Sequence, residues 1–177
     1  VVLNDEIHSA RDVRKTDNNR IDTFLSTEWG ALGVVDSDGV IFRRSSETLH
    51  TVQALPSLAG VETLPAVPIV ADFAGNDAMV LRSWAKQGVA GIVVQAFGGG
   101  RTSPEMRRAI SEIASEGIPV VLASRVPEGR VIGSGQQAQS GVVAGGDLPP
   151  HKARVLLMLA LLHSRDGTEI QAIFDTH

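Results

Sequence analysis

Apolar and polar positions alternate regularly from about residue 67 to the end of the chain. Short apolar runs of strand-forming residues are separated there by longer segments in which apolar residues recur at helical spacing. The pattern predicts alternating strands and helices, and right-handed crossovers make such a sheet parallel with helices on its faces. The expected strands cover 67–72, 89–95, 118–123 and 142–144, and the expected helices cover 76–87, 104–116, 149–163 and 168–175.

Capping residues and helix breakers support these boundaries. Residues 102–105 read Thr-Ser-Pro-Glu, which combines a hydroxyl cap, a first-turn proline that loses no hydrogen bond, and an acid at the positive end of the helix dipole. Gly88 and Gly117 end the helices before them, and the glycine- and glutamine-rich residues 129–141 predict a loop. The other expected caps are Asn76 or Asp77, Asp147 before the Pro149-Pro150 pair, and Thr168 paired with Gln171.

One apolar run ends abruptly in three glycines. Residues 89–100 read VAGIVVQAFGGG, so a buried strand delivers a glycine loop to the carboxyl edge of the sheet. Ligands bind at that edge in open parallel sheets, where a loop without side chains lets backbone N–H groups come close. A tight strand-to-helix turn needs the same glycines, and the loop alone does not decide between the two interpretations.

The first 43 residues follow a different pattern. Residues 1–3 resemble the end of a buried strand, the charged segment 7–16 is typical of a solvated surface, and 20–25 can form a short helix. Residues 33–35 and 40–42 flank Asp-Ser-Asp-Gly, and Asp-Gly between β-branched runs predicts a β-hairpin. The two aspartates fit this turn better than a calcium loop, because the other ligands of such a loop are missing.

Periodicity disappears between residues 44 and 66, where prolines and serines stand among isolated leucines. We therefore expect an amino-terminal segment 1–43, an interdomain linker 44–66 and a carboxy-terminal domain 67–177. The first residue, Val1, already lies inside a strand pattern without a preceding methionine, so we expect further sequence upstream. The predicted fold is α/β, with a small flavodoxin-like domain that follows the tail, a strand plus a β-hairpin, of a larger α/β domain.

Composition limits the classes of partner. The 177 residues are 43% hydrophobic and 20% charged, which is enough for one α/β core. A formal net charge of -4 argues against nucleic acid and anionic membranes, so we expect a small-molecule or protein partner. The chain has no cysteine, and its five histidines are scattered singly, so we expect no metal and no cofactor. The longest apolar run, 155–162, is far shorter than the roughly 20 residues of a membrane span, and we expect a cytoplasmic protein.

Five separated motifs stand at residues 4–7, 11–16, 30–33, 124–129 and 146–154. In their residues, order and spacing they resemble the bacterial-type two-domain L-asparaginase/glutaminase family, and the resemblance covers essentially the whole chain. The resemblance implies hydrolysis of the side-chain amide of asparagine, in some members also of glutamine, to the acid and ammonia. It implies a homotetramer built as a pair of intimate dimers. It also implies that this chain holds the end of the larger amino-terminal domain and the complete smaller domain.

The resemblance assigns one catalytic residue here, Lys15 of the Arg-Asp-Val-Arg-Lys-Thr motif. The threonine nucleophile, a second threonine and an aspartate of the family lie upstream of Val1, so the 177-residue chain alone is predicted to be inactive. A threonine hydroxyl needs a base, or a cation that favours its alkoxide and the developing oxyanion, and lysine supplies either. Without the motif, Lys15 would be a solvated lysine in a charged segment.

The glycine loop departs from the family pattern. The family often has a form like Gly-x-Gly-Asn, contributed across the intimate dimer, whereas this chain has Gly-Gly-Gly-Arg at 98–101. Gly99 stands where asparagine is common and Arg101 follows, so both are candidate substrate-binding residues for the neighbouring subunit. A glutamate of the family has no clear match in 133–139. The alternatives are a stand-alone module that binds a small anion, or a domain for subunit association, and neither gives the Lys15 motif a purpose.

Overall fold

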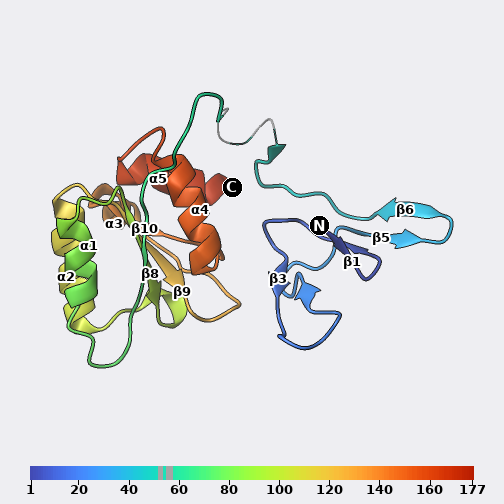
Figure 1. Cartoon of the computed structure of the whole chain (residues 1–177), viewed down its shortest axis with the longest axis horizontal. Coiled ribbons are helices and arrows are strands. Elements are labelled where there is room, and N and C mark those ends of the chain that lie inside the picture. Colours follow the sequence, from blue (N-terminus) through green and yellow to red (C-terminus); the bar gives the residue numbers. More distant parts are fainter. Residues whose placement is uncertain (52–53, 55–57) are drawn as a thin grey trace. The chain divides into compact units, whose positions relative to one another are not determined.

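The structure is a computed structural model that describes residues 1–51, 54 and 58–177. The chain forms two compact units, Val1–Thr51 and Val52–His177, which are described separately (Figure 1). Part of the expected linker, including Pro56 and Ser57, lies outside the described residues. The boundaries 1–43, 44–66 and 67–177 therefore stay predictions.

The first unit consists of short antiparallel strands. Its main sheet has the order β1-β2-β5-β6, and β3 pairs with β4 in a separate two-stranded ribbon. The predicted hairpin is confirmed, because Asp36 pairs with Gly39 and leaves a two-residue loop between the strands. The strands are β1 (Val2–Leu3), β2 (Glu6–Ile7), β3 (Arg14–Lys15), β4 (Phe24–Leu25), β5 (Gly33–Asp36) and β6 (Gly39–Phe42).

Two expectations for this unit are wrong. Val1 and Val2 are 56% and 60% exposed, not buried, because the chain reverses at Asn4 and Asp5, both with positive φ, and β1 becomes the outer strand. Residues 20–25 form no helix, because a turn around Asp17 leads them back into β4, which pairs with β3.

The second unit contains a four-stranded parallel sheet in the order β10-β9-β8-β7. This confirms the predicted parallel α/β domain flanked by helices. The strands are β7 (Ile69–Ala71), β8 (Ile92–Ala96), β9 (Val120–Ser124) and β10 (Val142–Ala144). The helices are α1 (Met79–Lys86), α2 (Pro104–Ser115), α3 (Gly135–Gln139), α4 (Pro150–Ala160) and α5 (Gly167–Thr176).

Alternate side chains of the sheet enter two separate cores. Val93 of β8 and its neighbours in β9 and β10 pack with Leu157 of α4 and Ile170 of α5. Ile92 and Val94 point to the other face and pack with side chains of α1 and α2. Helices α1 and α2 lie on one side of the sheet and α4 lies on the other (Figure 1). Burial on both faces explains why β8 is an apolar run without alternation. No helix of the described residues combines the length and apolarity needed to cross a membrane.

Several helix starts differ from the prediction. α1 begins after Ala78, and the side chains of Asn76 and Asp77 accept the N–H groups of Ala78 and Met79 at 2.9 and 3.0 Å. Asp147 does not occupy the cap position of α4, because Leu148 N–H bonds Gly145 C=O at 3.2 Å and places Asp147 inside a turn. The cap position is taken by Pro149, and α4 ends at Ala160 rather than at residue 163.

The last helix and one short helix also correct the prediction. Asp166, not Thr168, caps α5, and its carboxylate accepts the N–H groups of Thr168 and Glu169 at 2.8 and 3.1 Å. The segment predicted as a loop contains α3, which starts with a reciprocal capping box between Ser134 and Gln137. Gly88 and Gly117 follow α1 and α2 with φ of 72° and 85°, as predicted for helix ends.

Gln171, expected as a capping partner, instead pairs with the outer side of β10. Its side-chain oxygen accepts the Ala144 N–H at 2.8 Å, and its amide nitrogen donates to the Ala144 C=O at 3.3 Å and to Asp175 Oδ1 at 2.9 Å. The side-chain amide thus satisfies the backbone groups of a buried residue at the edge of the sheet.

We predict that Gln171→Leu lowers the free energy of unfolding by about 1–3 kcal/mol, because the buried Ala144 N–H and C=O lose their partner. Urea unfolding of the chain measures this loss. Gln136→Leu is the matched control, since Gln136 is exposed on α3, and its effect should stay within about 0.5 kcal/mol. Equal unfolding midpoints for the two variants would contradict a role for the Gln171 amide.

Candidate functional site

Lys15 lies in β3, directly opposite Phe24 of β4. Its side chain is exposed, and within the described part of the chain its ammonium group has no hydrogen bond or ion pair. The two-stranded ribbon thus presents a cation without a counterion. The Lys15 ammonium group is therefore available to interact with a chemical group from outside the described residues.

Bonds between Thr16, Asp17 and Thr23 close the ribbon next to Lys15. Thr16 donates to the Thr23 C=O through its backbone N–H at 2.7 Å and through its hydroxyl at 2.9 Å. Asp17 N–H donates to Thr23 Oγ1 at 2.8 Å. The Thr23 hydroxyl in turn donates to the Asp17 C=O, which holds the two chain segments together. The backbone that carries Lys15 is therefore fixed from its carboxyl side.

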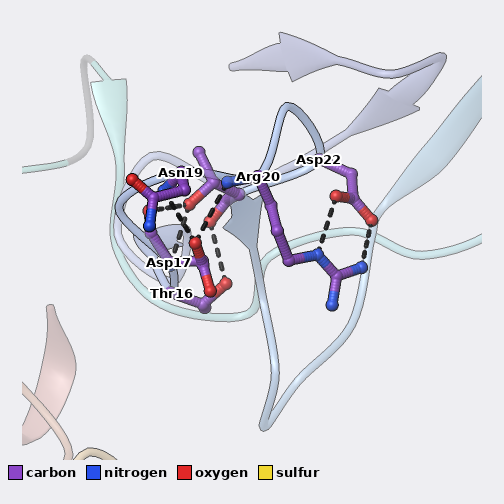
Figure 2. Close-up of polar contacts among 6 residues, drawn as sticks. Thr16, Asp17, Asn19, Arg20 and Asp22 are labelled. Carbon is purple, nitrogen blue, oxygen red and sulfur yellow. Dashed lines mark hydrogen bonds and ion pairs between the residues drawn. The ribbon is translucent and has the colours of Figure 1, made fainter.

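Asp17 organises the turn between β3 and β4 (Figure 2). Its Oδ1 accepts the N–H groups of Asn19 and Arg20 at 2.7 and 3.0 Å. These two bonds, the one from Asn19 first, lower the pKa of the Asp17 carboxyl below 3.8. Charged Asp17 is therefore the form that holds the turn.

A second pair stands beside Asp17 in the same turn (Figure 2). The Arg20 guanidinium donates to both carboxylate oxygens of Asp22, at 3.0 and 2.6 Å. This bidentate contact lowers the pKa of Asp22 and raises the pKa of Arg20. Both side chains are largely exposed, so the pair orients the turn more than it stabilises the unit.

The glycine loop forms one tight turn after β8. Gly100 N–H bonds the Phe97 C=O at 3.1 Å, and Phe97 N–H bonds the Arg101 C=O at 2.9 Å. Gly99 and Gly100 have φ of 66° and 78°. A β-carbon on Gly100 would lie 2.5 Å from Val131 Cγ1, so this position requires glycine. A β-carbon on Gly99 would meet nothing within 4 Å, and asparagine tolerates the left-handed conformation found there.

The side chain of Arg101 is exposed at the end of this loop. No hydrogen bond or ion pair of its guanidinium is found among the residues that the structure describes. Gly99 and Arg101 therefore share one loop of the second unit, whereas Lys15 belongs to the first unit. The two candidate sets therefore belong to different units.

Sequence reasoning missed a polar cluster at the same edge of the sheet. Asp72, only 3% exposed, follows β7 and accepts the Ser103 N–H at 2.6 Å, the Ser103 hydroxyl at 2.9 Å and the Phe73 N–H at 2.9 Å. Ser103 occupies the cap position of α2, as expected, but its hydroxyl binds Asp72 and not the helix. Arg125 donates to the Asp72 C=O at 2.8 Å and stacks on Phe97. A polar residue at the carboxyl end of a parallel strand was the available signal.

The loop before β10, in which the family glutamate has no match, borders an open cavity of about 380 Å³. Arg130, Ser134, Gln171 and Asp175 are among its lining residues. Asp175 contributes a carboxylate to the lining of this cavity, and that carboxylate accepts a hydrogen bond from the Gln171 amide. Over the described ranges 1–51, 54 and 58–177, no three His, Asp or Glu side chains are arranged to hold a metal ion.

We predict that the turn beside Lys15 responds to acid. Because the native pKa of Asp17 is lowered, the stabilisation by its carboxylate is present above pH 3.8 and is lost as the pH falls through the native pKa. An NMR titration should show Asp17 titrating below 3.8, with the amide shifts of Asn19 and Arg20 following it. In Asp17→Ala these amide shifts should lose that transition. An Asp17 midpoint at or above 3.8 would contradict the bonding described here.

Comparison with known families gives two matches. Residues 66–174 match the family model described as "Glutaminase/Asparaginase C-terminal domain". Residues 1–48, which include Lys15, match the one described as "Asparaginase, N-terminal". The two matches cover both units of the structure.

Curated proteins align over nearly the whole chain. It is 34% identical to "Probable L-asparaginase periplasmic" of Haemophilus influenzae, over 99% of this chain and 51% of that protein. It is 34% identical to "L-asparaginase 2" of Bacillus subtilis, with 100% and 47% covered, and 36% identical to "Glutaminase-asparaginase" of Acinetobacter glutaminasificans, with 98% and 54% covered. The chain spans about half the length of these relatives. Since the carboxy-terminal family model alone matches more than half of its residues, the chain belongs to the asparaginase/glutaminase family.

Proposed function

We propose that this chain is the carboxy-terminal part of an asparaginase-type amidohydrolase, which converts L-asparagine and water to L-aspartate and ammonia. The observation that carries the proposal is Lys15, an exposed cation without a counterion in its unit, inside a segment matched by the amino-terminal asparaginase family model. The relatives named asparaginase or glutaminase-asparaginase make asparagine the first candidate substrate and glutamine the second.

In this proposal Lys15 activates a threonine nucleophile that the upstream part of the protein supplies. The threonine oxygen attacks the amide carbon, ammonia leaves, and water then hydrolyses the acyl-enzyme. As an ammonium group, Lys15 favours the threonine alkoxide and the negative oxygen of the tetrahedral intermediate, and as an amine it accepts the hydroxyl proton. The hydrogen bonds among Thr16, Asp17 and Thr23 fix the backbone of the β3–β4 ribbon, so the Lys15 side chain starts from a defined position.

Gly99 and Arg101 are proposed to bind the substrate in the site of a neighbouring subunit. The Arg101 guanidinium suits a carboxylate, which it binds in a bidentate way, and it is exposed at the end of the glycine loop. Gly99 is exposed in the same loop, and without a side chain it leaves its backbone accessible. This role requires a homo-oligomer, and we propose the tetramer that the family resemblance implies. A cytoplasmic location stays a prediction, since the name of one relative places that relative in the periplasm.

One observation favours a second candidate function. The unit Val52–His177 buries two apolar cores of its own, and therefore has the packing of a domain that folds alone. A stand-alone module for a small anion or for subunit association would have this property. Ammonia release by the full-length protein separates the two candidates, because a binding module releases none.

We predict that the 177-residue chain releases no ammonia from asparagine, and that adding the upstream part of the protein, fused or as a separate fragment, restores turnover. Lys15→Ala in the reconstituted protein should lower kcat/KM by a factor of thousands with little loss of stability. Lys86→Ala is the control, because Lys86 is likewise exposed but lies on α1. Ammonia release by the isolated chain in proportion to its concentration would overturn the assignment.

We predict that Arg101→Ala in the full-length enzyme raises the KM for asparagine by roughly 10-fold or more, equivalent to about 1.4 kcal/mol of lost binding. Arg107→Ala, an exposed arginine on α2, should leave KM unchanged.

A mixing experiment tests whether Arg101 acts in the neighbouring subunit. When Lys15→Ala and Arg101→Ala subunits are mixed and reassociated, each hybrid dimer should contain one intact site and recover low-KM activity. Mixtures that give only the sum of the two separate activities would place Lys15 and Arg101 in one subunit's site or in none.

A further inference from the structure

We propose that Asp72, Ser103 and Arg125 are positioning residues that hold the glycine loop in the conformation that presents Arg101. We call their contacts with Phe97 and with one another the loop clamp. The inference rests on the substrate-binding role proposed for Arg101. It adds three residues to that site, from three different connections of the sheet.

The exit of the loop is held by Asp72. Ser103 stands two residues after Arg101, and both its N–H and its hydroxyl donate to the Asp72 carboxylate, at 2.6 and 2.9 Å. Hydrogen bonds to a carboxylate are stronger than those between neutral groups, and Asp72 is shielded from water at 3% exposure. Asp72 itself is fixed, because its N–H bonds the Gln95 C=O at 3.0 Å. The backbone after Arg101 thus has a rigid attachment.

The entry of the loop is held by Arg125. Its guanidinium carbon lies 4.2 Å from the centre of the Phe97 ring, in cation–π geometry. The same guanidinium donates to the Asp72 C=O at 2.8 Å, and the Arg125 N–H bonds the Ala96 C=O at 2.9 Å. Phe97 N–H bonds the Arg101 C=O across the loop. Both ends of the loop are therefore tied to Asp72, one directly and one through Arg125.

These contacts are poorly suited to fold stabilisation alone. Asp72, Ser103 and Arg125 belong to neither apolar core, and burying a carboxylate carries a desolvation cost that an apolar residue avoids. Ser103 also gives up the usual cap bond to α2 in order to bind Asp72. The polar groups converge instead on the two ends of a four-residue segment whose last member is an exposed arginine.

A double-mutant cycle in the full-length enzyme tests the clamp. Ser103→Ala should raise the KM for asparagine about 3- to 10-fold with kcat within about 2-fold, and Ser103→Thr should restore the original KM. In an Arg101→Ala background, Ser103→Ala should add nothing, because the residue that the clamp positions is already absent. Ser115→Ala is the matched control, an exposed serine at the other end of α2. Additive effects of Ser103→Ala and Arg101→Ala would overturn the proposal.

A second measurement needs no activity. In the 177-residue chain, Ser103→Ala and Arg125→Met should speed amide hydrogen exchange at Phe97 and Gly100 by about 10-fold or more, with exchange in β9 unchanged. Ser115→Ala and Arg107→Met should change neither. Unchanged exchange at Phe97 and Gly100 overturns the clamp, even if the enzyme is active. An inactive full-length enzyme with accelerated loop exchange overturns the proposed function and supports the clamp as a device for ordering the loop.

Discussion

Burial of both faces of β8 and β9, the central strands of the parallel sheet, is the constraint on which the second unit depends. Val93 enters one core while Ile92 and Val94 enter the other, and helices seal both sides. Polar side chains are disfavoured between a sheet and the helices packed on it, so they are found where the strands end. Asp72, Arg101 and Arg125 stand in the segments that follow β7, β8 and β9, and their arrangement is a consequence of how the sheet is packed.

The first unit lacks this kind of packing. Among its described residues, the buried apolar side chains are those of Ile7 and Val13, whereas Ile21, Val40 and Phe42 are 88%, 60% and 62% exposed. Its order comes from strand pairing and from local polar bonds such as those of Asp17. Local bonds define the backbone around Lys15 well, but they contribute little to global stability because water competes for them.

Sequence predicted the architecture where local and global signals agree. The strands, the hairpin at Asp36 and the helix ends at Gly88 and Gly117 follow from periodicity and from glycine's conformational freedom. The caps assigned to Asp147 and Thr168 were wrong, because Pro149 takes the cap position of α4 without a side-chain bond and the Asp166 carboxylate caps α5. The capping box of α3 was present in the sequence but lay in a segment read as a loop.

The candidate site was predictable in part. Lys15 and Arg101 emerged from resemblance and from the glycine motif, and their roles stay predictions. The loop clamp was out of reach, because Ser103 and Arg125 contact Asp72 from 31 and 53 positions away in the sequence. No local pattern records such a contact, and only the order of the parallel strands brings the three residues together.

The amide of Gln171 has a consequence for how copies of this protein can meet. An open sheet edge is a template on which another chain can add a strand, and such growth does not stop at a defined size. Because Gln171 occupies the donor and the acceptor of Ala144, a foreign strand cannot register against the end of β10 without first displacing it. Assembly by strand addition at that edge, at the end of β10, is thereby discouraged.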